Sequence, residues 1–171
     1  MRHAAMLLIK PIDLDDHGSE AVANRADSFE VSFGSAGEFF SAYRKDGSLY
    51  LDHLRGRMAE QPGSCVHAWN GSTLVGQIEL RDGREDPQEG YVNLYYLVPR
   101  LRGRGLGQEL DAYAIRWFLD RGMTSAALGV SRTNARALRF YKKMGWVSCG
   151  EHPKGKNAIL MRKELERSHA A

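Results

Sequence analysis

Residues 91–107 read YVNLYYLVPRLRGRGLG, and this stretch sets the expectation for the fold. Its first half, Tyr91–Val98, is rich in aromatic and β-branched residues and is closed by Pro99, which predicts a strand. Its second half carries glycines at positions 103, 105 and 107 and leads into an apolar stripe with helical spacing. The stripe consists of Leu106, Leu110, Tyr113, Ala114, Trp117 and Phe118. The stretch therefore predicts a strand, a glycine loop and a long helix in that order.

The glycine loop is predicted to bind phosphate. Without Cβ atoms, several backbone N–H groups can converge on one anion at the start of a helix. Arg102 and Arg104 can add side-chain contacts to phosphate oxygens. The alternative is a tight turn that needs glycine only for steric reasons. The loop is no dinucleotide-binding or kinase G-x-G-x-x-G motif, because position 108 is Gln, and no Walker A loop, because no Gly-Lys-Ser/Thr follows.

The flanking sequence predicts further elements on both sides. Strands are expected at Met6–Ile9, Ser64–Trp69, Thr73–Leu80, Ser125–Ser131, Trp146–Gly150 and Ala158–Arg162. Helices are expected at Asp13–Asp27, from Ser48 to about Pro62, and after a cap at Thr133 or Asn134. Helices that alternate with strands indicate an α/β fold with a mixed sheet, antiparallel in the hairpin part and parallel in the β-α-β part.

Composition and charge exclude several classes of protein. The chain has 171 residues, a size typical of one domain, and no apolar stretch approaches the ~20 residues of a membrane span. Two cysteines, Cys65 and Cys149, form neither a disulfide framework nor a metal knuckle, and the six histidines show no paired ligand spacing. A formal charge of +3 is compatible with an anionic ligand but too low to predict a nucleic-acid partner. We expect a cytoplasmic protein without a metal.

Two motifs resemble the GNAT superfamily of N-acetyltransferases. The family carries Arg/Gln-x-x-Gly-x-Gly/Ala directly after a strand, and residues 102–107, RGRGLG, match this pattern in full. Its second signature is an Asn, then an Ala, then Phe-Tyr, then Gly-Phe or Gly-Trp. Residues 134–146, NARALRFYKKMGW, match it about 30 residues downstream. The resemblance covers residues 64–165 and is weak before them.

The resemblance implies one domain over residues 1–171, with 64–165 as the acetyl-CoA-binding core and 1–62 as the wall on the acceptor side. It implies a mixed, twisted sheet flanked by helices, in which the strands Tyr91–Val98 and Ser125–Ser131 are parallel and splay apart around acetyl-CoA. The pyrophosphate would lie on the loop, the pantetheine arm along the edge of the first strand, and Asn134 beside that arm. The implied cofactor-binding residues are Leu97, Val98, Arg102, Gly103, Arg104, Gly105, Leu106, Gly107, Asn134 and Tyr141.

The chemistry of acetyl transfer needs a proton acceptor and a proton donor. A lysine-like amine has a pKa of about 10.4 and must lose a proton before it attacks. A backbone N–H near Val98 is the expected donor to the oxyanion. The resemblance points Tyr141 at the thioester sulfur, where the phenol can protonate the departing thiolate. The alternative for Tyr141 is packing on the inner face of its helix.

The general base is less evident from the sequence. Many family members use a Glu on a central strand, but the strand Tyr91–Val98 has no carboxylate, and Asn93 stands where an acid often does. The nearest acid on a flanking strand is Glu79, which alternation places on the same face as Gln77. Glu79 is either the base or an ordinary solvent-facing carboxylate. Alternation also puts Asn93 and Tyr95 on one face, where they are expected to line the acceptor site.

We therefore predict direct acetyl transfer from acetyl-CoA to a primary amine of a small molecule or a peptide. The alternative is a non-catalytic domain that binds or senses acyl-CoA and has lost its base, as Asn93 suggests. No nucleic-acid or membrane partner is expected, and the protein is expected to be a monomer or a homodimer.

Overall fold

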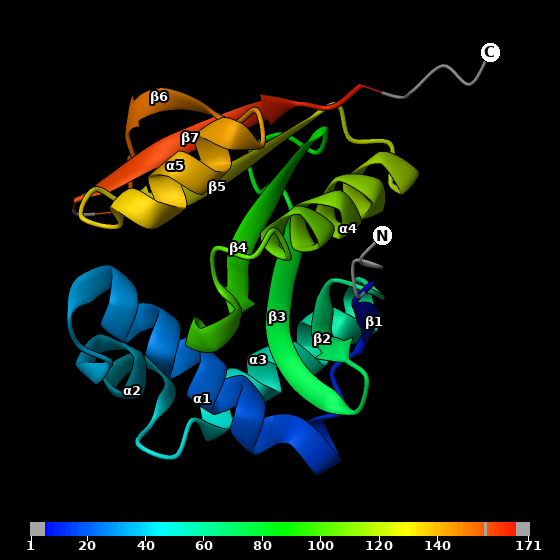
Figure 1. Ribbon diagram of the computed structural model, residues 1–171, viewed down its shortest axis with the longest axis vertical. Helices are drawn as coiled ribbons and strands as arrows, with labels where there is room; N and C mark the ends of the chain where they lie inside the picture. Colours follow the sequence, from blue (N-terminus) through cyan, green and yellow to red (C-terminus); the bar gives the residue numbers. More distant parts are fainter. Residues whose placement is uncertain (1–5, 156, 167–171) are drawn as a thin grey trace.

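The computed structural model describes residues 6–155 and 157–166. A central sheet has the strand order β1-β2-β3-β4-β5-β7-β6, and helices flank it (Figure 1). The strands are β1 Leu8–Pro11, β2 Cys65–Asn70, β3 Thr73–Asp82, β4 Glu89–Leu97, β5 Ser125–Ser131, β6 Val147–Glu151 and β7 Ala158–Glu164. The helices are α1 Leu14–Phe33, α2 Gly37–Tyr43, α3 Ser48–Glu60, the short 3₁₀ helix η1 Pro99–Leu101, α4 Gly107–Asp120 and α5 Ala135–Lys143. The predicted mixed α/β fold is confirmed.

Two hydrophobic clusters hold the layers together. The larger one packs α4 and α5 against the sheet and includes Phe118, Leu128 and Trp146. The smaller one lies among α1, α2 and α3 and includes Phe39 and Leu54. The helices therefore form two groups, α1–α3 on one side and α4–α5 on the other, with the sheet between them (Figure 1).

The amino-terminal helices differ from the predicted ones. Asp13 caps α1, since its Oδ1 accepts from the backbone N–H groups of Asp15 and Asp16. The helix then continues past Asp27 to Phe33 and stops at Gly34, which has a left-handed φ of 76°. Helix α2 was not predicted. Helix α3 begins at Ser48, which is its first residue rather than its cap; the cap position belongs to Gly47.

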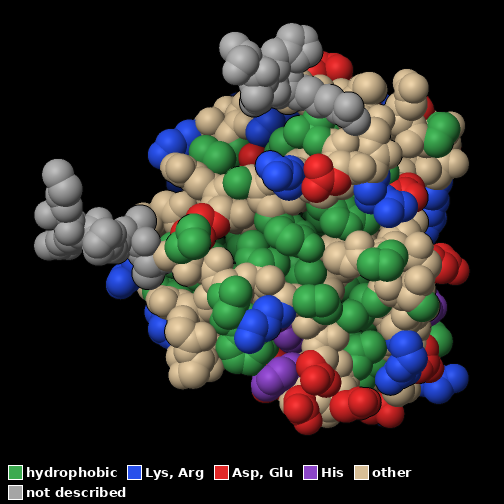
Figure 2. Space-filling view, turned by 90° about the vertical axis from the view of Figure 1, so that its right-hand side faces the viewer, with side chains coloured by type: hydrophobic (Ala, Val, Ile, Leu, Met, Phe, Trp, Pro, Cys, Tyr) green, Lys and Arg blue, Asp and Glu red, His purple; other side chains and the backbone are tan. Residues whose placement is uncertain are grey.

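Strand β1 runs over Leu8–Pro11, two residues later than expected, and includes the proline that was expected to stop it. An edge strand tolerates proline, because the missing N–H costs no ladder hydrogen bond on the open side. The side of the molecule that carries β1 exposes hydrophobic side chains in its centre, with charged residues around them (Figure 2). No helix in the described part of the chain is long and apolar enough to cross a membrane.

The expected splay lies between β4 and β5. These two strands are parallel and pair only from Glu89↔Ser125 to Val92↔Leu128. Beyond Val92, β4 continues to Leu97 without β5, while β5 stays paired with β7 up to Ser131. A V-shaped opening between two adjacent strands follows from this register (Figure 1).

A β-bulge in β4 lies at the point where the splay begins. Glu79 pairs with Leu94 but Leu80 pairs with Val92, so Asn93 is an extra residue in β4. An extra residue breaks the alternation of side chains along a strand. The expectation that Asn93 and Tyr95 share a face is therefore wrong.

Candidate functional site

The glycine loop joins β4 to α4 and has the backbone geometry expected of an anion site. Gly103 and Gly105 have φ values of 75° and 85°, in the left-handed region that favours glycine. Within the described residues, no backbone N–H from position 103 to position 107 donates a hydrogen bond. These N–H groups precede the first turns of α4, where the partial positive charge of the helix is largest. The loop is thus arranged to receive an oxyanion.

Gly107 has a different reason to be glycine. A Cβ atom there would lie 2.8 Å from the Phe140 ring of α5. By contrast, a Cβ atom at Gly103 or Gly105 would meet nothing within 4 Å. Gly107 therefore lets α5 pack closely against the start of α4, and it supports the loop through this packing.

The two arginines of the loop behave differently. Arg102 Nε donates to the Leu97 carbonyl at 2.7 Å, and its Nη2 lies 3.1 Å from Asp27 Oδ2 of α1. Arg102 thus ties the end of β4 to α1. Its predicted phosphate contact stays a prediction. Arg104 is exposed and forms no hydrogen bond or ion pair within residues 6–155 and 157–166. Arg104 is free to contact a ligand.

The edge at the end of β4, at Leu97 and Val98, is only partly free to bind a ligand. Leu97 and Val98 are half-buried and pack against the larger cluster, as Leu106 does. The Val98 N–H donates to the Val75 carbonyl at 2.9 Å, so this particular N–H is not free for an oxyanion. The pantetheine contacts predicted for Leu97 and Val98 stay predictions.

Asn134 and Tyr141 lie at the two ends of α5. Asn134 caps the helix, because its Oδ1 accepts from the Ala137 N–H at 3.1 Å. Tyr141 packs beside Tyr95 and Trp146, with ring centroids 6.0 and 6.1 Å apart. Its hydroxyl forms no hydrogen bond within the described ranges. Burial, with a smaller effect from Asp111, raises the pKa of Tyr141, so the phenol carries its proton at neutral pH.

Tyr95 lies on the α4 side of the sheet, away from Asn93. Its hydroxyl donates to Asp111 Oδ1 at 3.3 Å, and the same atom accepts from Trp146 Nε1 at 2.9 Å. Lys163 Nζ lies 3.0 Å from the other oxygen of Asp111. Tyr95 thus belongs to a buried network behind Tyr141, and its predicted role with Asn93 in one acceptor wall has no geometric support.

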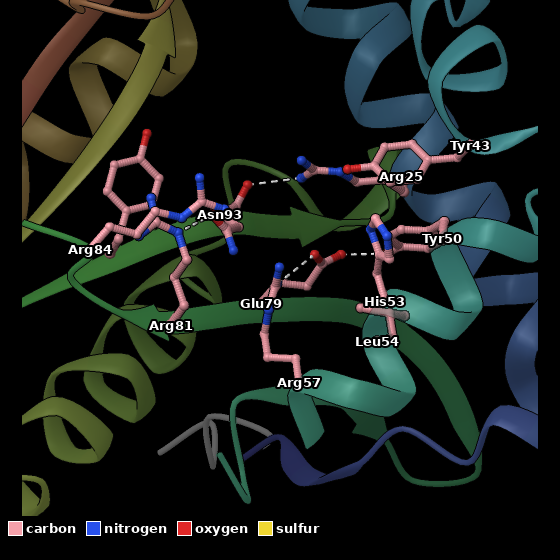
Figure 3. A pocket seen from close by; sticks show the side chains of 11 residues that line it. Arg25, Tyr43, Tyr50, His53, Leu54, Arg57, Glu79, Arg81, Arg84 and Asn93 are labelled. Carbon is pink, nitrogen blue, oxygen red and sulfur yellow. Dashed lines mark hydrogen bonds and ion pairs between the residues drawn. The ribbon is translucent and has the colours of Figure 1, made fainter. Parts of the chain in front are cut away.

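A pocket of about 250 Å³ opens on the opposite side of the sheet, between α1–α3 and strands β3 and β4. It contains Glu79, with Arg81 and Arg84 on one side and Tyr50 and His53 on the other (Figure 3). The complete lining is Arg25, Tyr43, Tyr50, His53, Leu54, Arg57, Glu79, Arg81, Arg84, Tyr91 and Asn93. Of the predicted site residues, Glu79 and Asn93 meet here.

Glu79 is 3% exposed, so it is no ordinary solvent-facing carboxylate. Its Oε1 accepts from the Tyr50 hydroxyl and from Gln77 Nε2 at 3.1 Å, and Arg57 Nη1 lies 3.5 Å from its Oε2. The bond from Gln77 confirms that the two side chains share a face. Burial, followed by the charge of Glu79, raises the pKa of Tyr50 well above its usual range, so this phenol stays a donor.

The network behind Glu79 is fully polar and buried. Gln77 Nε2 also donates to the Tyr50 oxygen at 2.8 Å, so the remaining atom, Gln77 Oε1, is an acceptor. It accepts from Asn24 Nδ2 and from His67 Nε2, each at 3.1 Å. His67 is 1% exposed, and burial lowers its pKa, which favours the neutral ring. The hydrogen bonds fix the position of Gln77 and, through it, of the carboxylate.

Sequence reasoning missed the helical side of the pocket. Arg25, Tyr43, Tyr50, His53 and Arg57 are spread over three helices without a motif. No local signal could have found them. Within the described residues, no group of three or more His, Cys, Asp or Glu side chains could hold a metal ion.

Comparison with known proteins identifies the family. The model of the acetyltransferase (GNAT) family matches residues 31–146. A mycothiol acetyltransferase of Thermomonospora curvata is 30% identical over 114 residues, which cover 65% of this chain and 38% of that protein. The chain therefore spans about two fifths of the length of this relative.

Solved structures share the fold. The PaiA N-acetyltransferase of Thermoplasma acidophilum, solved in complex with coenzyme A, has a TM-score of 0.74 at 20% identity, over 92% of this chain and 98% of that one. YncA of Salmonella typhimurium, a putative acetyltransferase solved with acetyl-CoA, has a TM-score of 0.68 at 17% identity, over 96% of each chain. Because the family model matches well over half of the sequence, this chain belongs to the GNAT family of acetyltransferases.

Proposed function

We propose that this protein transfers the acetyl group of acetyl-CoA directly to a primary amine. The observation that carries the proposal is the row of unpaired N–H groups at 103–107, which lies at the end of β4, the strand whose bulge borders the Glu79 pocket. The loop would hold the pyrophosphate and the pocket would hold the amine. Family membership and the coenzyme A bound to a structural neighbour support this arrangement.

In this reaction the neutral amine attacks the thioester carbonyl carbon. The N–C bond forms in a tetrahedral intermediate whose nitrogen is positively charged. This nitrogen loses a proton to a base, and the C–S bond breaks to release the thiolate. Glu79 is the carboxylate within the pocket, and it accepts the proton directly or through a water molecule. Its contacts with Tyr50 and Gln77 hold the carboxylate in place while the proton moves.

Tyr141 is the proposed donor to the departing thiolate. Its hydroxyl is unpaired within the described residues, and its raised pKa keeps the proton on the phenol before the reaction. A thiol has a pKa of about 8.5, so this phenol is the weaker acid. Tyr141 therefore acts by hydrogen bonding to the sulfur as negative charge develops on it, and it shares its proton with the sulfur as the bond breaks.

The domain division follows the same arrangement. Residues 1–62 supply the helical wall of the pocket, and residues 64–165 supply the loop, the splay and Tyr141. We propose that residues 1–171 form one domain. The cytoplasmic location and the monomeric or homodimeric state stay predictions.

One observation favours a second function, a non-catalytic acyl-CoA sensor. Asn93, at the bulge, offers an amide where the family resemblance implies an acid, and the Glu79 carboxylate already has three partners. Such a protein would bind acetyl-CoA but would not turn it over. Steady release of free thiol with a panel of amines separates the two functions.

The test of the proposed base compares Glu79→Gln with wild type. We expect kcat to fall roughly 10²- to 10⁴-fold, the usual contribution of one positioned base. The Kd for coenzyme A, measured by calorimetry, should stay unchanged, and binding should need no added metal. Glu60→Gln, at the exposed end of α3, is the matched control. Wild-type turnover in Glu79→Gln would assign the proton to solvent.

A further inference from the structure

The pocket around Glu79 is strongly basic. Four of its lining residues are arginines, and a single residue is a carboxylate, which gives a formal charge of +3 with His53 neutral. A pocket that selects a polyamine would need several acids to balance the extra ammonium groups of its ligand. The charge of this pocket has the opposite sign.

The arginines of the pocket largely lack acidic partners. Arg25 Nη1 donates to the Asn93 carbonyl at 2.8 Å, and Arg81 Nε donates to Asn93 Oδ1 at 3.3 Å; both acceptors are neutral. Arg84 forms no hydrogen bond or ion pair within residues 6–155 and 157–166. Elsewhere, the arginines paired with a carboxylate include Arg102, Arg121, Arg132 and Arg162. Uncompensated positive charge is thus gathered in the pocket.

Two further observations point to a missing anion. Arg57 Nη1 is buried without a hydrogen-bond partner in the described part of the chain, although it lies 3.5 Å from Glu79. Burial, followed by repulsion from Arg84, lowers the pKa of Arg81 below its ordinary value. A guanidinium in these conditions gains hydrogen bonds and charge compensation when an oxyanion binds.

We propose that the acceptor is a small amine that carries a carboxylate or phosphate group, bound by Arg81 and Arg84 while its amine faces Glu79. This inference rests on the proposed function. Figure 3 shows the arrangement that it requires, with Glu79 between Arg81 and Arg84 on one side and Tyr50 and His53 on the other. A volume of about 250 Å³ suits a ligand the size of an amino acid. The anion takes no part in bond making and only orients the amine.

The test compares matched acceptors that differ in one charge. L-Amino acids are assayed against their amides, and phosphoethanolamine against ethanolamine, at equal concentrations of neutral amine, with spermidine as the cationic probe. We expect kcat/KM to favour the anionic member by about 10- to 100-fold, the contribution of a charge-assisted hydrogen bond. The two pairs distinguish carboxylate from phosphate.

Variants assign the preference to the arginines. In Arg84→Gln and Arg81→Gln, the ratio of kcat/KM between the anionic and the neutral acceptor should fall about 10-fold or more, through KM for the anionic acceptor. Arg55→Gln is the matched control, because Arg55 lies on α3, exposed, two residues from Arg57. An unchanged preference in both pocket variants overturns the assignment.

The remaining outcomes separate this inference from the proposed function. Turnover of spermidine or of neutral amines in preference to anionic ones overturns the inference and leaves the acetyltransferase intact, as does turnover of peptides alone. If no amine is turned over, calorimetry with coenzyme A present measures whether the protein binds anionic amines. Binding of anionic amines that Arg84→Gln weakens supports the inference and overturns the proposed function; no binding of any anionic amine overturns the inference.

Discussion

The glycine loop at 103–107 offers backbone N–H groups from five consecutive residues, whereas the Glu79 pocket is lined by side chains from three helices, two strands and a loop. The two regions are connected through β4, which carries Asn93 of the pocket and leads through η1 into the loop. A backbone site depends on conformation, and a few glycines can encode it. A side-chain site depends on the packing of distant segments. The loop can therefore be recognised from contiguous residues, whereas the pocket exists only in the folded chain.

The largest effect is expected from a charge placed in the backbone site. Gly105→Glu should weaken coenzyme A binding by about 10³-fold or more, because a carboxylate would meet the pyrophosphate and displace charge-assisted hydrogen bonds. Calorimetry measures the loss. Gly122→Glu is the control, since Gly122 has a similar φ of 78°, also has open space beside it and lies at the other end of α4. Equal affinity in a folded Gly105→Glu protein would place the phosphates elsewhere.

The next effect tests whether the Tyr141 hydroxyl assists the departure of the thiolate. Tyr141→Phe removes only the hydroxyl, which is unpaired in the described residues. We expect kcat to fall roughly 10²- to 10⁴-fold with little change in the Kd for coenzyme A, because the hydroxyl acts on charge that exists only as the thiolate leaves. Unchanged turnover would show that Tyr141 is a packing residue. A loss of affinity at constant kcat would make it a cofactor-binding residue instead.

A smaller effect tests the close packing of Gly107 against α5. Gly107→Ala forces the Phe140 ring to move and should destabilise the fold by about 1–2 kcal/mol, which lowers Tm by several degrees. Gly56→Ala on α3 meets nothing within 4 Å and should stabilise the helix by about 0.5–1 kcal/mol. Phe140→Leu should partly restore the Gly107→Ala protein. If both alanine variants gained stability, close packing of α5 would not explain Gly107.

The smallest effect concerns the polar network of the pocket. Burial lowers the pKa of His67, so below about pH 6.5 the unfolded chain binds a proton that the folded protein does not. This contribution makes the free energy of unfolding fall as the pH falls, by at most about 1.4 kcal/mol per pH unit until the folded pKa is reached. His67→Gln should remove the contribution of His67 and make the slope shallower. Denaturant titrations between pH 7 and pH 5 measure it, and identical slopes in the two proteins would contradict the assignment.

Much of the carboxy-terminal half could be predicted because its signals are local. Strand β5 occupies Ser125–Ser131 as expected, and Asn134 caps α5. Gly122, just beyond the end of α4, has a left-handed φ of 78°. Caps, glycine stops and apolar stripes act over a few residues, so they can be recognised without the rest of the fold. The same reasoning predicted that α1 ends at Asp27, six residues before its observed end at Phe33. Packing in the smaller cluster extends the helix beyond its clearest sequence pattern.

The sequence by itself determined the order of the elements, the glycine loop and the family motifs, because each is encoded by contiguous residues. Only the tertiary structure decided which side chains share a face and which meet in the pocket. The bulge at Asn93 depends on the register between β3 and β4, and it moved Tyr95 away from the predicted acceptor wall. The cluster of Arg25, Arg57, Arg81 and Arg84 depends on how α1 and α3 pack over the sheet. Register and packing are long-range properties, since residues separated by tens of positions must be brought together before either exists.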